Sequence, residues 1–273
     1  MWQPSEVKRR KAPGPLGVGG LIVAVIVLVA GLVSLADSDV VESPSESPGI
    51  APTPIPEKTV SPKATTGHGT AIAALNALAV KGRAPKTGYS REQFGQSWRD
   101  LDRNGCDQRN DVLRRDLSEF TLKAGTHGCL VLSGTLTSPY SGDVIHFVRG
   151  QRTSYEVQID HVVALSDAWQ KGAQQWSTAK RESFANDFLE LRATDGHTNG
   201  SKSDSDAASW LPPRHAYRCE FVAHQIAVKK EYGLWVTGAE HDTMDRILQT
   251  CPEQGLPRAD PIKLGGGPEQ KAE

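Results

Sequence analysis

The sequence lacks an excess of charge of either sign. Its 31 Lys and Arg residues are balanced by 32 Asp and Glu residues, which leaves a formal net charge of −1. Composition therefore does not indicate a polyanionic partner, and any basic surface has to be local. The HExxH, GxSxG and GxxxxGKS/T patterns are absent as well. These absences argue against a zincin-type metal hydrolase, a GxSxG serine hydrolase and a P-loop nucleotide-binding module.

Cysteine is scarce, and none of the four cysteines stands in a CxxC pair. Without paired spacing, a zinc site built from cysteine is not indicated. An even number of cysteines is typical of disulfides in an oxidising compartment. Cys106, Cys129, Cys219 and Cys251 allow three connectivities. We expect Cys106–Cys129 and Cys219–Cys251, because each pair lies within one half of the folded region; free buried thiols are the alternative.

The N-terminal quarter of the chain, residues 1–68, has the pattern of an export signal followed by a linker. Basic residues in segment 1–15 precede an uncharged apolar run over 16–36, which is long enough to cross a hydrocarbon core of ~30 Å. We expect a cytoplasmic N-terminus followed by a single transmembrane anchor, with a signal peptide cleaved near Ala36 as the alternative. Segment 37–68 is rich in Ser-Pro and Thr-Pro steps and predicts a disordered linker. The rest of the chain would then lie outside the membrane or be secreted.

Residues 69–255 are expected to fold, and 256–273 to form a disordered tail. Apolar periodicity predicts helices over 71–80, 91–98, 110–120, 166–172, 177–186, 198–210, 215–232 and 238–249. Strands are predicted over 129–136, 144–148, 155–161 and 188–193, with the first two joined as a hairpin by the turn at Pro139–Gly142. This mixture predicts an α+β fold with a small sheet.

Chemistry is concentrated in five polar residues. Asp160 and His161 end a β-rich run, and Asn186, Asn199 and Lys202 follow. Hydrolysis of a phosphodiester needs a base, for which histidine is suited, and a divalent cation to stabilise negative charge. Mg²⁺ prefers oxygen ligands, which Asp160 and Asn199 can supply. Lys202 shares a helical face with Asn199 and can hold a phosphate oxygen, while Asn186 fixes the intervening loop.

These residues stand in motifs that resemble a known family. The motifs are IDHVVAL at 159–165, NDFLEL at 186–191, NGSKSD at 199–204, WLPP at 210–213 and GYSR at 88–91. Together they resemble the HNH endonuclease superfamily, and within it the C-terminal domain of GmrSD-type restriction endonucleases, in the form carried by exported actinobacterial proteins. The resemblance covers about residues 70 to 251.

The resemblance implies a ββα-metal core with surrounding helices and Mg²⁺-dependent cleavage of DNA, with Mn²⁺ as the alternative to Mg²⁺. It implies His161 as general base, Asp160 and Asn199 as metal ligands, and Asn186 and Lys202 as further members of the site. Asn199 stands where many members have histidine, which weakens the case for zinc or nickel.

We therefore expect an extracytoplasmic HNH endonuclease whose partner is a nucleic acid, in the first place double-stranded DNA, and no protein partner is implied. The alternative is a non-catalytic, disulfide-stapled surface domain that binds DNA or a cell-wall polymer. The balanced charge and the export address motivate that alternative.

Overall fold

The predicted α+β architecture is present in the computed structural model, which describes residues 69–151 and 153–258. All of them belong to the second of the two units into which the chain divides, Pro62–Glu273. The predicted segments 1–15, 16–36 and 37–68 and most of 256–273 lie outside the described residues. Within residues 69–151 and 153–258, no helix is both long and apolar enough to cross a membrane.

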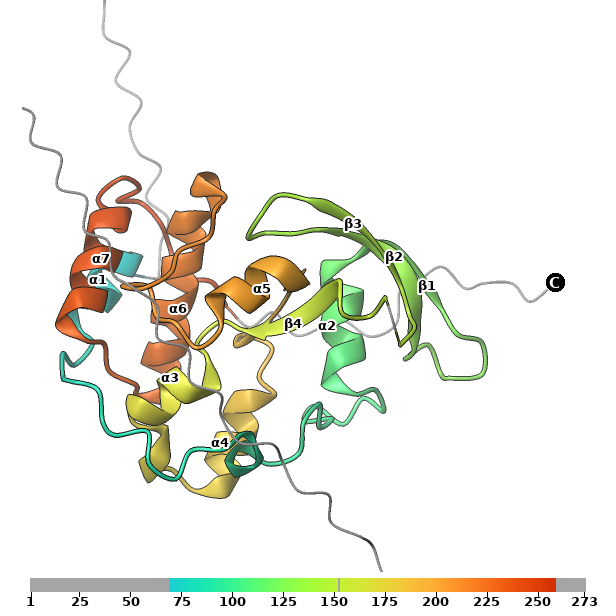
Figure 1. The fold of residues 1–273 in the computed structure, drawn as a ribbon, viewed down its shortest axis with the longest axis horizontal. Coiled ribbons are helices and arrows are strands. Elements are labelled where there is room, and N and C mark those ends of the chain that lie inside the picture. Colours follow the sequence, from blue (N-terminus) through green and yellow to red (C-terminus); the bar gives the residue numbers. More distant parts are fainter. Residues whose placement is uncertain (1–68, 152, 259–273) are drawn as a thin grey trace, which may run out of the picture. The chain divides into compact units, whose positions relative to one another are not determined.

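The described residues form helices, three short 3₁₀ turns and five strands. Figure 1 shows how these elements are arranged in space. The helices are α1 (Ala71–Asn76), α2 (Gln108–Asp116), α3 (Leu165–Gln170), α4 (Thr178–Ala185), α5 (Gly196–Lys202), α6 (Arg218–Tyr232) and α7 (Gly238–Leu248), and the 3₁₀ turns are η1 (Arg91–Phe94), η2 (Ala173–Gln175) and η3 (His215–Tyr217). The strands are β1 (Ser118–Leu122), β2 (Val131–Thr137), β3 (Val144–Val148), β4 (Val157–His161) and β5 (Leu191–Asp195).

The strands form two antiparallel sheets rather than the one small sheet predicted. One has the order β1-β2-β3, and the other pairs β4 with β5. The hairpin predicted around residues 139–142 is confirmed as β2 and β3. In the second sheet, Asp160 lies opposite Arg192, and His161 lies opposite Leu191. The two residues of the Asp-His pair therefore sit at the end of a paired strand.

Several element ends differ from the prediction. The helix expected over 110–120 stops at Asp116, and residues 118–122 form β1 instead. The helix expected over 198–210 is α5, which begins at Gly196 and ends at Lys202. Ser203 ends it because this residue adopts a φ of +50°. The helices expected over 71–80 and 91–98 shorten to α1 and η1.

Helix α6 lies between two hydrophobic clusters. Its residues Phe221 and Ile226 pack with α1 and α7, and Val228 packs with residues of α3 and α4. A helix that is buried on all sides needs apolar residues around its whole circumference, which α6 has from residue 221 to 228 with few exceptions. A third cluster joins α2 to both sheets and buries Val157 and Ile159 of β4. The strand that carries Asp160 and His161 is therefore held in place by the packing of Val157 and Ile159 in this cluster.

Both predicted disulfides are confirmed. Cys106 is bonded to Cys129, and Cys219 to Cys251. The first links the segment before α2 to the segment before β2, and the second links the start of α6 to the end of α7. Each closes a loop in the unfolded chain and so reduces the entropy gained on unfolding.

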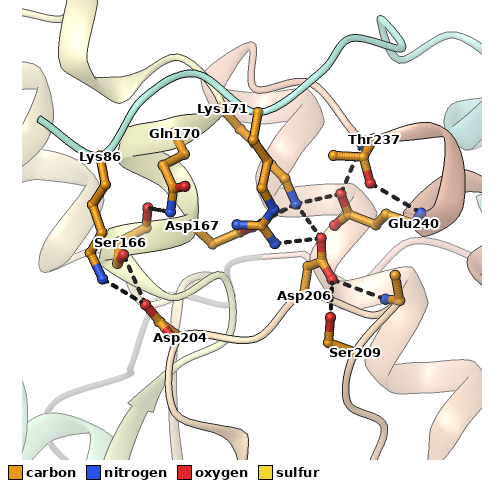
Figure 2. Close-up of polar contacts among 12 residues, drawn as sticks. Lys86, Ser166, Asp167, Gln170, Lys171, Asp204, Asp206, Ser209, Thr237 and Glu240 are labelled. Atoms are coloured by element: carbon orange, nitrogen blue, oxygen red, sulfur yellow. Dashed lines mark hydrogen bonds and ion pairs between the residues drawn. The ribbon is translucent and has the colours of Figure 1, made fainter.

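A cluster of five buried charged residues connects three helices. Lys171 Nζ lies 2.8 Å from Asp167 Oδ1, 2.9 Å from Asp206 Oδ2 and 2.6 Å from Glu240 Oε2 (Figure 2). Lys229 Nζ lies 3.0 Å from Glu240 Oε1 and 3.2 Å from Asp167 Oδ2. We call this set the buried ionic cluster. It anchors the segment that follows α5, because Asp206 belongs to that segment.

Candidate active site

The two sheet residues of the site point to opposite sides of β4. Successive side chains of a strand alternate between its faces, so Gln158 and Asp160 share one face and His161 lies on the other. Helix α5 packs beside β4 (Figure 1). Gly196 opens this helix, and a Cβ there would lie 2.2 Å from the carbonyl oxygen of Tyr155. Glycine is therefore needed for the helix to begin so close to the chain that leads into β4.

Asp160 is buried and has partners at both carboxylate oxygens. Lys202 Nζ lies 3.0 Å from its Oδ1, and the hydroxyl of Tyr140 donates to its Oδ2 at 2.7 Å. Burial raises the pKa of the Asp160 carboxyl, although the charge of Lys202 acts in the opposite direction. Burial and the neighbouring Asp160 carboxyl hold the pKa of Tyr140 well above its ordinary value, so the phenol stays a donor.

Lys202 is fully buried and bridges two groups at the end of β4. Besides Asp160, its ammonium contacts the carbonyl oxygen of His161 at 2.8 Å. The sequence predicted a phosphate contact for this lysine. That contact stays a prediction. In the structure the side chain has no exposed surface, and its ammonium pairs with Asp160 and holds the backbone of the histidine.

His161 has one ring nitrogen bound and the other free. Its Nε2 lies 3.0 Å from the carbonyl oxygen of Ala185. A carbonyl can only accept, so Nε2 carries the proton and Nδ1 keeps its lone pair. Burial lowers the pKa of His161 to about 3, which leaves the ring neutral at pH 7. Within residues 69–151 and 153–258, no group hydrogen-bonds to Nδ1.

A small pocket adjoins the His161 ring. Its lining includes Arg91, Phe94, Trp98, Leu165 and Ala185. The Trp98 ring is stacked nearly parallel to the imidazole, with ring centroids 6.5 Å apart and an interplanar angle of 21°. Arg91 is exposed at the pocket. The pocket therefore combines a neutral imidazole, an aromatic wall and a guanidinium.

Asn186 fixes the segment that carries Trp98. It lies at the C-terminal end of α4 and is fully buried. Its Oδ1 accepts from the backbone N–H of Arg99 at 3.0 Å, and its Nδ2 donates to the carbonyl oxygens of Gln96 and Glu182 at 3.0 and 2.9 Å. Its neighbour Ala185 provides the acceptor for His161. The segment that Asn186 holds in place is therefore residues 96–99.

Asn199 lies on the same side of β4 as Lys202, as the i, i+3 spacing predicted. Its Nδ2 donates to Gln158 Oε1 at 2.7 Å, two positions before Asp160 on the strand. The side chain is half-buried. In the described part of the chain, no group donates a hydrogen bond to its Oδ1.

The donor set of Asp160 and Asn199 suits a hard cation. Carboxylate and amide oxygens are the ligands that Mg²⁺ takes in proteins. Among the residues that the structure describes, however, no three or more His, Cys, Asp and Glu side chains are grouped to hold a metal ion. The Lys202 ammonium occupies Asp160 Oδ1. Chemically the donors fit, and a bound ion would have to exchange with this ammonium.

Four contributors to the site were not identified from the sequence: Tyr140, Trp98, Arg91 and Glu190. Glu190 is buried and accepts from the backbone N–H of Val163 at 3.1 Å. Burial raises its pKa well above the ordinary value, beside the backbone that follows His161. Tyr140 is 20 residues from Asp160, and Trp98 more than 60 residues from His161. No local pattern marks residues so distant as partners.

The comparison with known proteins identifies the family. Residues 107–247, just over half of the chain, match the family described as GmrSD restriction endonucleases, C-terminal domain. The chain belongs to this family. Asp160, His161, Asn186, Asn199 and Lys202 all lie within the matched span. Membership indicates a nuclease-like enzyme with a nucleic acid as substrate, in a family whose members commonly use divalent metals.

A relative covers most of the folded region. An uncharacterized secreted protein of Arthroderma benhamiae is 37% identical over 202 residues, which are 73% of this chain and 92% of the relative. The similarity thus extends beyond the family match at residues 107–247.

Proposed function

We propose that the protein is a metal-dependent HNH endonuclease that hydrolyses phosphodiester bonds of DNA. The observation that carries this proposal is the state of His161. Its Nε2 is committed to the Ala185 carbonyl, its Nδ1 has no hydrogen-bond partner among the described residues, and the residue lines a small pocket. Strands β4 and β5 followed by α5 support a ββα core of the HNH type.

His161 acts as general base in the proposed reaction. Nδ1 takes a proton from water, the water oxygen attacks phosphorus, and the bond from phosphorus to the 3′ oxygen breaks. The leaving oxygen takes a proton from solvent, which gives a 3′-hydroxyl and a 5′-phosphate. A bound phosphodiester would raise the low pKa of the buried imidazole through its negative charge, which increases the drive for proton transfer.

Arg91 binds the phosphate in this proposal. Its guanidinium is exposed at the pocket next to His161, and Arg–phosphate pairs form two parallel hydrogen bonds. Trp98 offers an aromatic wall on which a base or sugar can pack. Asn186 and Lys202 are positioning residues, because neither side chain is exposed to a substrate.

The proposed metal is Mg²⁺ with Asp160 and Asn199 as its ligands, and Mn²⁺ as a second choice. When bound, the ion would stabilise negative charge on the phosphate and the leaving oxygen. Support comes from the oxygen donors and from Asn199 Oδ1, which accepts no hydrogen bond from any described residue. The buried partner of Asp160, Lys202, stabilises the carboxylate in the absence of the ion.

We also place the activity outside the cytoplasm. Two disulfides are typical of oxidising compartments, and the Arthroderma relative is described as secreted. The membrane anchor or cleaved signal over residues 16–36 stays a prediction, since it lies outside the described residues.

One observation favours a second candidate, a non-catalytic domain that binds DNA or a cell-wall polymer. Both oxygens of Asp160 are already held by protein groups. A domain that no longer loads a metal would show this arrangement.

Digestion of supercoiled plasmid separates the two. The purified protein with both disulfides formed is incubated with plasmid and Mg²⁺, with Mn²⁺, and with EDTA, and a single-stranded RNA is tested in parallel. We expect nicked and linear DNA with either metal and none with EDTA. Intact plasmid under every condition, with retention of DNA in a gel-shift assay, would support the binding domain instead.

A further inference from the structure

The segment before α2 has the spacing of a calcium-binding loop. Asp100, Asp102, Asn104, Gly105 and Asp111 follow the pattern D-x-D-x-N-G-x₅-D. In loops of the EF-hand type, positions 1, 3, 5 and 12 supply side-chain oxygens, and position 6 is glycine because the chain turns sharply there. Gly105 has a φ of +90°, in the region that glycine alone adopts readily. Position 12 usually carries glutamate, and Asp111 is one methylene shorter.

Two carboxylates of this loop meet at one amide group. Asn104 Nδ2 donates to Asp102 Oδ2 at 2.8 Å and to Asp111 Oδ2 at 2.9 Å. Asp100 accepts from the backbone N–H groups of Asn104 and Gly105 at 3.1 and 2.9 Å. A single –NH₂ group therefore stands between two carboxylates, where a cation would be more strongly favoured than a neutral donor.

One carboxylate oxygen of Asp111 has no hydrogen-bond donor among the described residues. The residue is fully buried, and within residues 69–151 and 153–258 its Oδ1 has no hydrogen-bond donor. A buried carboxylate oxygen without a donor or cation is costly, so native proteins rarely leave one. A cation bound in the loop would offset the cost of burying this oxygen.

A second buried oxygen lacks a partner at position 9 of the loop. Gln108 is fully buried, and among the described residues its Oε1 accepts no hydrogen bond. Position 9 contributes to calcium sites, often through a water. Two oxygens at loop positions 9 and 12 are thus without donors, while the other polar atoms of the loop are largely paired.

We propose that residues 100–111 bind one Ca²⁺ ion, at a site separate from Asp160 and Asn199. In the described residues the carboxylates of Asp100, Asp102 and Asp111 are not grouped as metal ligands, so binding would draw them together around the ion. The ligands are the carboxylates of Asp100, Asp102 and Asp111, the carbonyl oxygen of Cys106 at position 7, Asn104 and water. Asn104 Oδ1 accepts from the backbone N–H of Cys106 at 2.8 Å. Rotation of the Asn104 amide would exchange that hydrogen bond for a contact between Oδ1 and the ion. Ca²⁺ rather than Mg²⁺ is assigned because a loop that offers six or more oxygen ligands suits the larger ion.

Hydrogen bonds connect the loop to residues at the His161 pocket. Gln108 donates from its backbone N–H to the carbonyl oxygen of Trp98 at 3.3 Å and from Nε2 to the carbonyl oxygen of Asn186 at 2.8 Å. The Cys106–Cys129 disulfide holds the loop from its other side. Calcium would therefore stiffen the segment that carries Trp98 without touching the reacting groups.

Terbium luminescence tests the site without any activity measurement. Tb³⁺ substitutes for Ca²⁺ and is sensitised by nearby tryptophan, and Trp98 stands two residues before Asp100. We expect saturable luminescence of the disulfide-bonded protein on excitation of tryptophan. Ca²⁺ should displace it with a Kd of roughly 10⁻⁴ to 10⁻³ M, the range of extracellular calcium modules, and should raise Tm.

Variants locate the ion. Asp102 is exposed, so Asp102→Asn should fold normally and weaken Ca²⁺ binding at least about tenfold, because affinity follows the charge count of the ligands. Asp143→Asn, an exposed acid in the β2–β3 turn, is the matched control and should bind as the parent protein does. Absence of Ca²⁺-displaceable luminescence, or unchanged affinity in Asp102→Asn, would overturn the proposal. Asp111→Asn adds a second test where it folds.

Discussion

The ammonium of Lys202 lies 3.0 Å from Asp160 Oδ1 and 2.8 Å from the carbonyl oxygen of His161. One buried cation thus ties the last turn of α5 to the end of β4. It neutralises the carboxylate and at the same time fixes the backbone from which the imidazole projects. The hydroxyl of Tyr140 completes the arrangement at the other carboxylate oxygen.

Removal of this ammonium should destabilise the fold. Lys202→Met leaves a buried carboxylate without its cation, and we expect the free energy of unfolding to fall by about 3 to 5 kcal/mol. Lys202→Met combined with Asp160→Leu removes both charges and should cost clearly less than the sum of the two single variants. Urea denaturation at pH 7 measures all four proteins. Additive losses would show that the two side chains are not coupled.

The buried ionic cluster makes a parallel prediction with a matched control. Lys171 is fully buried among three carboxylates (Figure 2), so Lys171→Met should lower the free energy of unfolding by about 3 to 5 kcal/mol. Lys86 pairs with Asp204 at 2.8 Å, and both side chains are about half exposed. Lys86→Met should therefore cost no more than about 1 kcal/mol. Equal losses in urea denaturation would contradict the assigned burial.

Stability should fall as the pH drops below neutrality, because two histidines are buried in the neutral form. Burial lowers the pKa values of His161 and His224 to about 3. Between roughly pH 6.5 and pH 3 these histidines are protonated in the unfolded chain but stay neutral in the folded protein. The free energy of unfolding therefore decreases as pH falls through this window. Each such group contributes up to about 1.4 kcal/mol per pH unit.

His224 isolates this effect away from the candidate active site. Its Nε2 donates to the carbonyl oxygen of Leu189. His224→Gln should reduce the slope of unfolding free energy against pH between pH 6 and 4.5 by about one proton, whatever it does to stability at pH 7. His215→Gln changes an exposed histidine and should leave the slope as it was. A slope unaffected by His224→Gln would show that this residue is not buried neutral.

Local patterns were sufficient for much of the fold. The turn at Pro139–Gly142 between two β-rich runs predicted the β2–β3 hairpin, and cysteine spacing predicted both disulfides. The i, i+3 spacing of Asn199 and Lys202 placed both on one face of α5. The structure bears this out, since they contact Gln158 and Asp160 on a single face of β4.

What the sequence could not supply depends on contacts between distant segments. Helix α5 stops at Lys202 because Ser203 takes a left-handed conformation, and the buried ionic cluster then holds Asp206. Lys171 and Glu240 are 69 residues apart, and nothing in either neighbourhood marks them as partners. The burial of Lys202 was missed for the same reason. From its sequence neighbours alone, a lysine is expected to be exposed to solvent. Lys202 is buried only because α5 and β4 pack together around it.

The role of His161 is tested most directly by the rate of plasmid cleavage in His161→Ala. The comparison uses initial nicking rates at pH 7.5 with Mg²⁺, and circular dichroism confirms that the variant is folded. His146→Ala, which changes an exposed histidine of β3, is the matched control. We predict that His161→Ala loses at least about 100-fold in rate, the usual contribution of a general base, while His146→Ala keeps the parent rate. Equal rates for the parent protein and folded His161→Ala would contradict the account.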